Sequence, residues 1–173
     1  MPVTPFHFGV GLLGKGLAPS RISFSSFVAS QVVIDCESAY YLFVAREWPV
    51  HRWAHTLAVA VPLGMTVGIA VWAASHLLGR RGGAHPSELG LWSCIAGGLL
   101  GGATHPLLDG IMHRDVQPFM PFAGGNPMLG LVSLGPLHLA CVAAAMLGGL
   151  LLLLRLRSVP IVARERLREG ELP

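Results

Sequence analysis

Charged residues are scarce in this sequence. Only 12% of the 173 residues are Asp, Glu, Lys or Arg, and 53% are hydrophobic, whereas an ordinary soluble domain carries about 25% charged residues. This composition excludes an ordinary soluble domain. The net charge is only +3, and the basic residues gather at segment ends and in the C-terminal tail instead of forming a stripe. The sequence therefore predicts no nucleic-acid partner.

Cysteine is also rare. The three cysteines, Cys36, Cys94 and Cys141, each lie within an apolar segment, and they form no CxxC pair. Cysteines of this kind behave as small buried hydrophobic residues. They predict neither a disulfide nor a thiolate metal site.

Long apolar runs are what the sequence has in abundance. A helix of about 20 apolar residues crosses a hydrocarbon core of about 30 Å, and four runs are long enough: 22–45, 54–79, 89–112 and 130–154. Residues 5–18 are apolar but too short to span, so they predict a half-helix packed against the others. We expect an all-α integral membrane bundle of four transmembrane helices plus this short N-terminal half-helix.

The basic residues predict the domain organisation and orientation. Residues 1–154 form the expected membrane-embedded domain, and residues 155–173 form a charged tail. If the tail is cytoplasmic, nine of the 12 Lys and Arg residues lie on the cytoplasmic side, as the positive-inside rule requires. The loops near 46–53 and 113–129 then face outward. A multi-pass protein of the bacterial inner membrane, with a cytoplasmic C-terminus, is the resulting expectation.

Ionisable residues interrupt the apolar runs at one end of the predicted bundle. The stretch "GGATHPLLDGIMHRD" repeats a polar residue every four positions, which places His105, Asp109 and His113 on one helix face. Asp35 and Glu37 lie two positions apart, about 200° around a helix, so both cannot face one centre. We expect Asp35 to face the bundle.

Histidines from two other segments are expected at the same depth. His51 and His55, in "HRWAHT", are expected one helical turn apart at the start of the second long run, and His7 lies in the half-helix. Imidazole and carboxylate groups together suit zinc or another divalent first-row metal. A bound cation would also offset the cost of placing carboxylates within the membrane. The sequence therefore predicts a divalent metal site at this end of the bundle.

Other interpretations stay open for single residues. His7 could pack against a loop, His51 could contact lipid headgroups, and His105 could form only a structural hydrogen bond with Asp109. His113, Arg114 and Asp115 are typical of a solvated loop. His138, alone in an apolar run, is typical of a hydrogen-bonded core histidine.

The ordered motifs resemble a known family. "TPFHFGVGLL", "VVIDCES", "HRWAHT", "GGATHPLLDG" and "PFMPF" are similar to the YdjM-type inner-membrane metal-dependent hydrolases, a bacterial group distantly similar to zinc-dependent phospholipase C. The resemblance covers residues 2–125. It implies that the metal ligands are His7, Asp35, His51, His105 and Asp109, with Asp109 as a bridge if two ions bind. The second ligand cluster of the secreted phospholipases has no counterpart, because Val142 follows His138 by four residues.

The resemblance also implies a reaction. Zinc, or alternatively manganese, would activate a water molecule for hydrolysis of a phosphoester or lipid-linked substrate among the membrane lipids. His55 would orient a ligand or carry a proton, and Arg52 would hold a phosphate oxygen. Two non-catalytic alternatives remain, a haem-binding four-helix bundle and an ion or proton relay. The sequence does not determine the oligomeric state.

Overall fold

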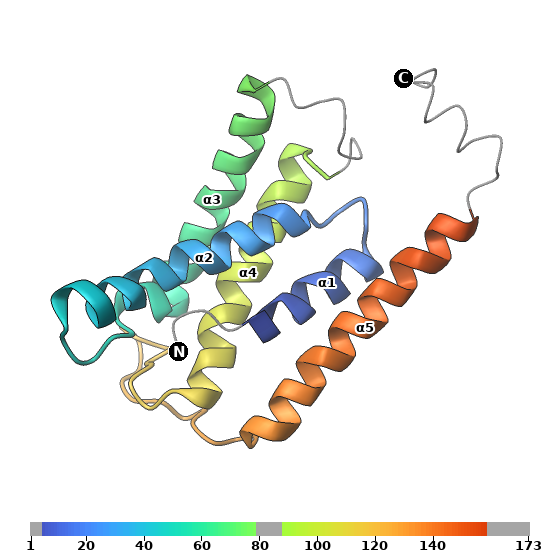
Figure 1. Cartoon of the computed structure of the whole chain (residues 1–173). Coiled ribbons are helices and arrows are strands. Elements are labelled where there is room, and N and C mark those ends of the chain that lie inside the picture. Colours follow the sequence, from blue (N-terminus) through green and yellow to red (C-terminus); the bar gives the residue numbers. More distant parts are fainter. Residues whose placement is uncertain (1–4, 79–87, 159–173) are drawn as a thin grey trace.

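The computed structural model describes residues 5–78 and 88–158, and these residues form helices with no strand among them. The α-helices in Figure 1 are α1 (Phe8–Leu17), α2 (Phe24–Ala39), α3 (Leu57–Leu77), α4 (Leu91–Met112) and α5 (Leu134–Ser158). The all-α prediction is confirmed. The predicted tail lies mostly outside the described residues, and its first four residues, 155–158, continue α5.

Short helical segments join or extend the long helices. A 3₁₀ turn, η1 (Pro5–His7), leads into α1, so the predicted half-helix is present as a short helix. The π-helix η2 (Tyr40–Ala45) extends α2, and the 3₁₀ turn η3 (Trp53–His55) precedes α3. Because the hydroxyl of Thr56 accepts the backbone N–H of Val59 and caps α3, that helix begins at Leu57.

The helices form a bundle in which α4 is central. In Figure 1, α3 and α4 lie side by side and α2 crosses both of them, while α1 lies between α4 and α5. Ten of the 22 residues of α4 are buried, whereas only four of the 21 residues of α3 are. The interior of the described bundle therefore lies along α4.

Glycine permits the close approach of α3 and α4. A Cβ atom on Gly98 would overlap the carbonyl oxygen of Gly64, and one on Gly64 would overlap the carbonyl oxygen of Gly98. Small residues at such crossings let two helix backbones touch. Gly98 and Gly102 of α4 therefore lie against the backbone of α3.

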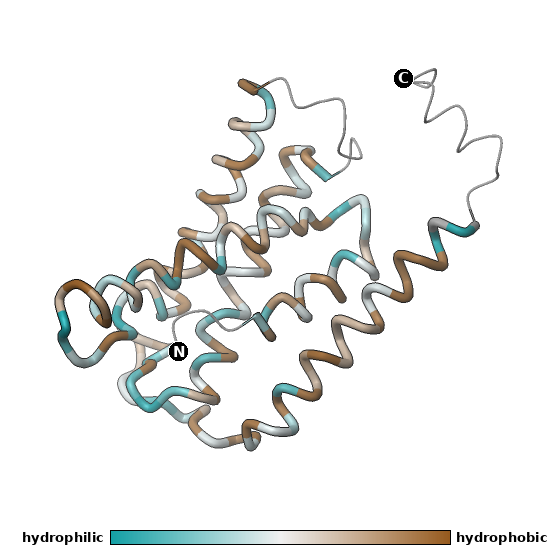
Figure 2. The backbone as a smooth tube through the Cα atoms, viewed as in Figure 1, coloured by the Kyte–Doolittle hydropathy of each residue, from teal (hydrophilic) through white to brown (hydrophobic). Residues whose placement is uncertain are grey.

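Three of the described helical segments are long and apolar enough to cross a membrane: Phe24–Ala45, Leu57–Leu77 and Leu134–Arg155. Many large apolar side chains on them are exposed, including Leu139 and Met146 on α5, and Figure 2 shows hydrophobic residues along α3 and α5. This pattern is consistent with a membrane protein. The fourth expected span, 89–112, corresponds to α4, which carries His105 and Asp109 and is not among these three.

A loop folds over the polar end of the bundle. The carbonyl oxygen of Pro118 accepts the N–H of Leu57 at 2.8 Å, which ties the loop to the start of α3. The Asn126 amide donates to the carbonyl oxygens of Gly110 and His113 at 2.7 and 3.0 Å, and thereby satisfies carbonyl groups at the end of α4. The loop thus fixes where residues 113–118 lie.

Candidate metal centre

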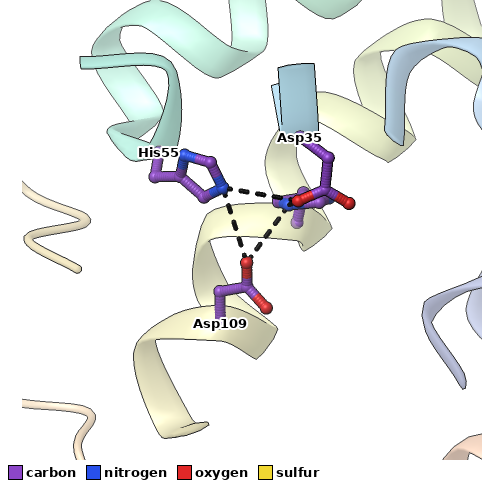
Figure 3. Close-up of side chains that lie close together, drawn as sticks. Asp35, His55 and Asp109 are labelled. Carbon is purple, nitrogen blue, oxygen red and sulfur yellow. Dashed lines mark ion pairs between the residues drawn. The ribbon is translucent and has the colours of Figure 1, made fainter. Parts of the chain in front are cut away.

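Four buried side chains meet where α2, η3 and α4 come together, and we call Asp35, His55, His105 and Asp109 the inner cluster. Each offers a nitrogen or oxygen atom within 4.8 Å of the other three. Asp35 comes from α2, His55 from η3, and His105 and Asp109 from successive turns of α4. Figure 3 shows His55 pointing toward both Asp35 and Asp109. A buried group of two imidazoles and two carboxylates could hold a metal ion.

The separations within the inner cluster match the edges of a coordination shell. His105 Nε2 lies 3.4 Å from Asp35 Oδ1 and 3.2 Å from Asp109 Oδ2. His55 Nε2 lies 3.7 Å from Asp35 Oδ1 and 3.6 Å from Asp109 Oδ2. Ligands about 2.0–2.2 Å from a tetrahedral zinc ion lie roughly 3.4 Å apart, whereas hydrogen-bonded atoms lie about 2.7–3.2 Å apart. Three of the four separations are longer than hydrogen bonds, and the fourth, between His105 and Asp109, lies at the upper limit of that range. The spacing is compatible with an ion between these atoms.

A side-chain oxygen contacts the Nδ1 atom of each imidazole in the inner cluster. Nδ1 of His105 contacts Oε1 of Gln31, and Nδ1 of His55 lies 3.3 Å from Oε2 of Glu37. The Nε2 atoms of the two histidines are buried without a hydrogen-bond partner. An acceptor on Nδ1 fixes the tautomer with a free lone pair on Nε2, as is usual behind metal-binding histidines.

His7 approaches the inner cluster from η1. Its Nε2 lies 3.4 Å from Asp109 Oδ1, and it too is buried without a hydrogen-bond partner. The His7 ring meets the His105 ring edge-on, with the centroids 5.1 Å apart. Burial lowers the pKa of His7 to about 4, which keeps the imidazole neutral and able to bind a metal.

Three further side chains, His51, His113 and Asp115, form an outer cluster whose candidate ligand atoms also lie within 4.8 Å of one another. Burial lowers the pKa of both His51 and His113. Burial alone would raise the pKa of Asp115, but hydrogen bonds from the backbone N–H and the ring of His51 hold it below its usual value. At neutral pH the cluster therefore offers neutral imidazoles beside a carboxylate.

Arg52 lies at the edge of a cavity next to the outer cluster. Its guanidinium donates to Glu47 Oε2 at 2.8 Å and lies 3.6 Å from the centre of the Tyr41 ring. The cavity measures about 170 Å³, and Arg52 lines it together with His51, Trp53, Thr56 and Asp115. Arg52 therefore borders the space in which a substrate could reach the histidines.

The structure distributes the predicted metal ligands over two places. It brings Asp35, His105 and Asp109 together in the inner cluster, with His7 alongside. His51, predicted as a ligand of the same site, lies instead in the outer cluster. His55, expected to orient a ligand or carry a proton, supplies an atom to the inner cluster.

Gln31, Glu37 and Asp115 make contacts that were not predicted from the sequence. Gln31 was not singled out, although it lies one helical turn before Asp35 and its amide is buried. Glu37 is not a member of the inner cluster, but its Oε2 lies 3.3 Å from Nδ1 of His55, the ring nitrogen that does not face Asp35. The loop expected to be solvated instead places the Asp115 carboxylate in a protected position, with 4% of the side chain exposed.

The contacts of His55, His105 and His138 bear on the haem-binding alternative. The rings of His55 and His105 touch with centroids 5.1 Å apart, which leaves no space for a porphyrin between them. His138 stacks on Phe6 with centroids 4.2 Å apart. In this arrangement His55 and His105 could not sandwich a haem between them.

Comparison of the chain with protein-family models, with curated proteins and with solved structures found no match. The geometry of the two clusters and the sequence motifs are therefore the basis for inferring a function.

Proposed function

We propose that this chain is a membrane-bound metal-dependent hydrolase whose inner cluster binds one divalent ion. The observation that carries the proposal is the convergence of unpartnered Nε2 atoms from His55 and His105 on two buried carboxylates, at separations typical of ligands around a metal. Two carboxylates in a protein interior need a cation nearby, because an unpaired buried charge is costly. The resemblance to the YdjM-type hydrolases points to the same reaction class.

Zinc is the first choice of ion, and manganese is the alternative. Two imidazoles and two carboxylates suit either ion. When bound, the ion would supply a Lewis acid and a water molecule acidic enough to act as a nucleophile near neutral pH. Asp35, His55, His105 and Asp109 would hold it, while Gln31 and Glu37 fix the orientation of the two imidazoles.

The substrate that fits the surroundings is a phosphoester of the membrane surface, lipid or lipid-linked. Arg52, Trp53 and Thr56 line the neighbouring cavity, and a guanidinium is well suited to a phosphate oxygen. Trp53 is largely exposed, as tryptophan often is at a membrane interface. We place the site on the outer face of a bacterial inner membrane, opposite a cytoplasmic C-terminus, because the Lys and Arg residues favour that orientation.

The first test measures metal and hydrolysis together. Elemental mass spectrometry on tag-free protein in detergent should find zinc or manganese in the wild type and about one ion per chain less in Asp35→Asn. Hydrolysis of phosphodiesters and phospholipid vesicles should fall at least a hundredfold in Asp109→Asn, which keeps the side-chain shape.

The matched control is His76→Gln on α3, because His76 belongs to neither cluster and its Nδ1 lies 3.2 Å from the carbonyl oxygen of Trp72. This variant should keep both metal and activity. Full activity in Asp109→Asn, or wild-type protein that binds neither metal after chelator-free purification, would contradict the proposal and favour an ion or proton relay.

A further inference from the structure

The outer cluster of His51, His113 and Asp115 has no part in holding the inner ion. Its members come from three places: the loop before η3, the C-cap residue that follows α4, and the loop after α4. The chain brings them together through the Asp115 carboxylate, whose Oδ2 accepts the backbone N–H groups of Val50 and His51, each at 3.1 Å. Two sequence-distant segments are thereby joined at the cluster.

The geometry of the outer cluster resembles a set of metal ligands. Nδ1 of His51 lies 3.0 Å from Asp115 Oδ2, and the His113 ring stacks on the His51 ring with centroids 4.6 Å apart. A structural His51–Asp115 hydrogen bond would explain the first contact alone. It does not explain why the His113 ring lies against the His51 ring. It also does not explain why one candidate ligand atom from each of the three residues lies within 4.8 Å of the other two.

Two cavities adjoin the outer cluster. His51 and Asp115 line the cavity of about 170 Å³ that Arg52 borders. Together with His113, they also line a second cavity of about 160 Å³ that extends to Leu42 and Trp48. The inner cluster has four protein ligands and lies deeper, whereas the outer one has three and faces these cavities. Three protein ligands with an open position are typical of catalytic zinc sites, and four are typical of closed ones.

We propose that His51, His113 and Asp115 form a second divalent-metal site, with at least one coordination position open to the adjoining cavities. The two sites are neighbours: His113 Nε2 lies 3.9 Å from Asp109 Oδ1, and the rings of His51 and His55 meet with centroids 4.6 Å apart. The second site gives His51 a role as a metal ligand without placing it in the inner cluster. Metal binding at this second site requires no hydrolytic activity at the inner cluster.

Metal stoichiometry tests this proposal directly. Tag-free protein in detergent is stripped with a chelator, reloaded with excess Zn²⁺, freed of unbound zinc by gel filtration and measured by elemental mass spectrometry. The wild type and the control His76→Gln should each bind two zinc ions per chain. His113→Gln and Asp115→Asn should each bind one, and the asparagine keeps an oxygen to accept the N–H groups of Val50 and His51.

Asp35→Asn distinguishes this site from the inner one, because it should lose the inner ion and retain the outer. A wild type that binds one ion, lost in Asp35→Asn but kept in His113→Gln, would overturn the second site and leave the proposed function standing. One ion lost in His113→Gln but kept in Asp35→Asn would support the second site and contradict the inner one. Two ions retained in both outer variants would also overturn the proposal.

Discussion

At the scale of single residues, the inner cluster depends on side chains that would not touch the metal. Gln31 is 2% exposed, and its amide donates to the carbonyl oxygen of Gly101 while its Oε1 contacts His105 Nδ1. This acceptor fixes which nitrogen of His105 faces the two carboxylates. Gln31 is therefore a positioning residue for the metal site.

Gln31→Leu should weaken zinc binding about 10- to 100-fold, because loss of a partner behind a metal-binding histidine typically has that effect. Gln31→Glu is the matched control: it keeps an oxygen beside His105 Nδ1 and should bind zinc nearly as well as the wild type. Competition with a fluorescent zinc chelator gives both affinities. Wild-type affinity in Gln31→Leu would show that Gln31 does not position His105.

At the scale of helices, the crossing of α3 and α4 sets the position of His55 relative to Asp109. His55 ends the turn that leads into α3, and Asp109 lies near the end of α4. The Gly64–Gly98 contact holds the two backbones together farther along the same pair of helices. Separation of these helices would therefore also change the inner cluster.

Gly98→Ala should destabilise the protein by about 1–3 kcal/mol, as overpacking does, and should also weaken zinc binding. Gly149→Ala on α5 is the control, because a Cβ there meets nothing within 4 Å. Thermal unfolding in detergent, followed by circular dichroism, measures the first effect, and zinc titration measures the second. Equal stability of the two variants would contradict the close packing of α3 on α4.

At the scale of the whole molecule, a metal in the inner cluster would act as a crosslink. Its ligands come from α2, η3 and α4, with His7 of η1 alongside. Direct hydrogen bonds also join these segments, among them Gln31 Nε2 to the carbonyl oxygen of Gly101 at 3.2 Å and Ala54 N–H to Glu37 Oε2 at 3.0 Å. An ion that binds the folded state alone stabilises it in proportion to the logarithm of its concentration.

Removal of metal with a chelator should therefore lower the Tm of the wild type, and added Zn²⁺ should restore it. At a free ion concentration 1,000 times the Kd, the stabilisation is about 4 kcal/mol. In the Asp35→Asn, Asp109→Asn double variant, the chelator should lower the Tm less than in the wild type, because the inner site has been removed. Scanning calorimetry in detergent with each protein provides the comparison, and an unchanged wild-type Tm would argue against a crosslinking ion.

The sequence by itself determined the helical architecture and part of the site. Scarce charge and long apolar runs left helices as the means of satisfying the backbone in a membrane, and three apolar helices of spanning length are present. The four-residue spacing of His105 and Asp109 places both side chains in the inner cluster, because a helix repeats every 3.6 residues. Asp35 and Glu37, which the same period separates, contact different nitrogens of His55.

Only the tertiary structure decided which histidine accompanies which carboxylate. His51 and His55 were expected one helical turn apart, but α3 begins at Leu57, and His51 lies in a loop before the 3₁₀ turn. The two rings therefore belong to different clusters. Asp115 reaches His51 because the loop after α4 folds back onto residues 50–51. Such contacts depend on chain reversal between distant segments, which no local periodicity encodes.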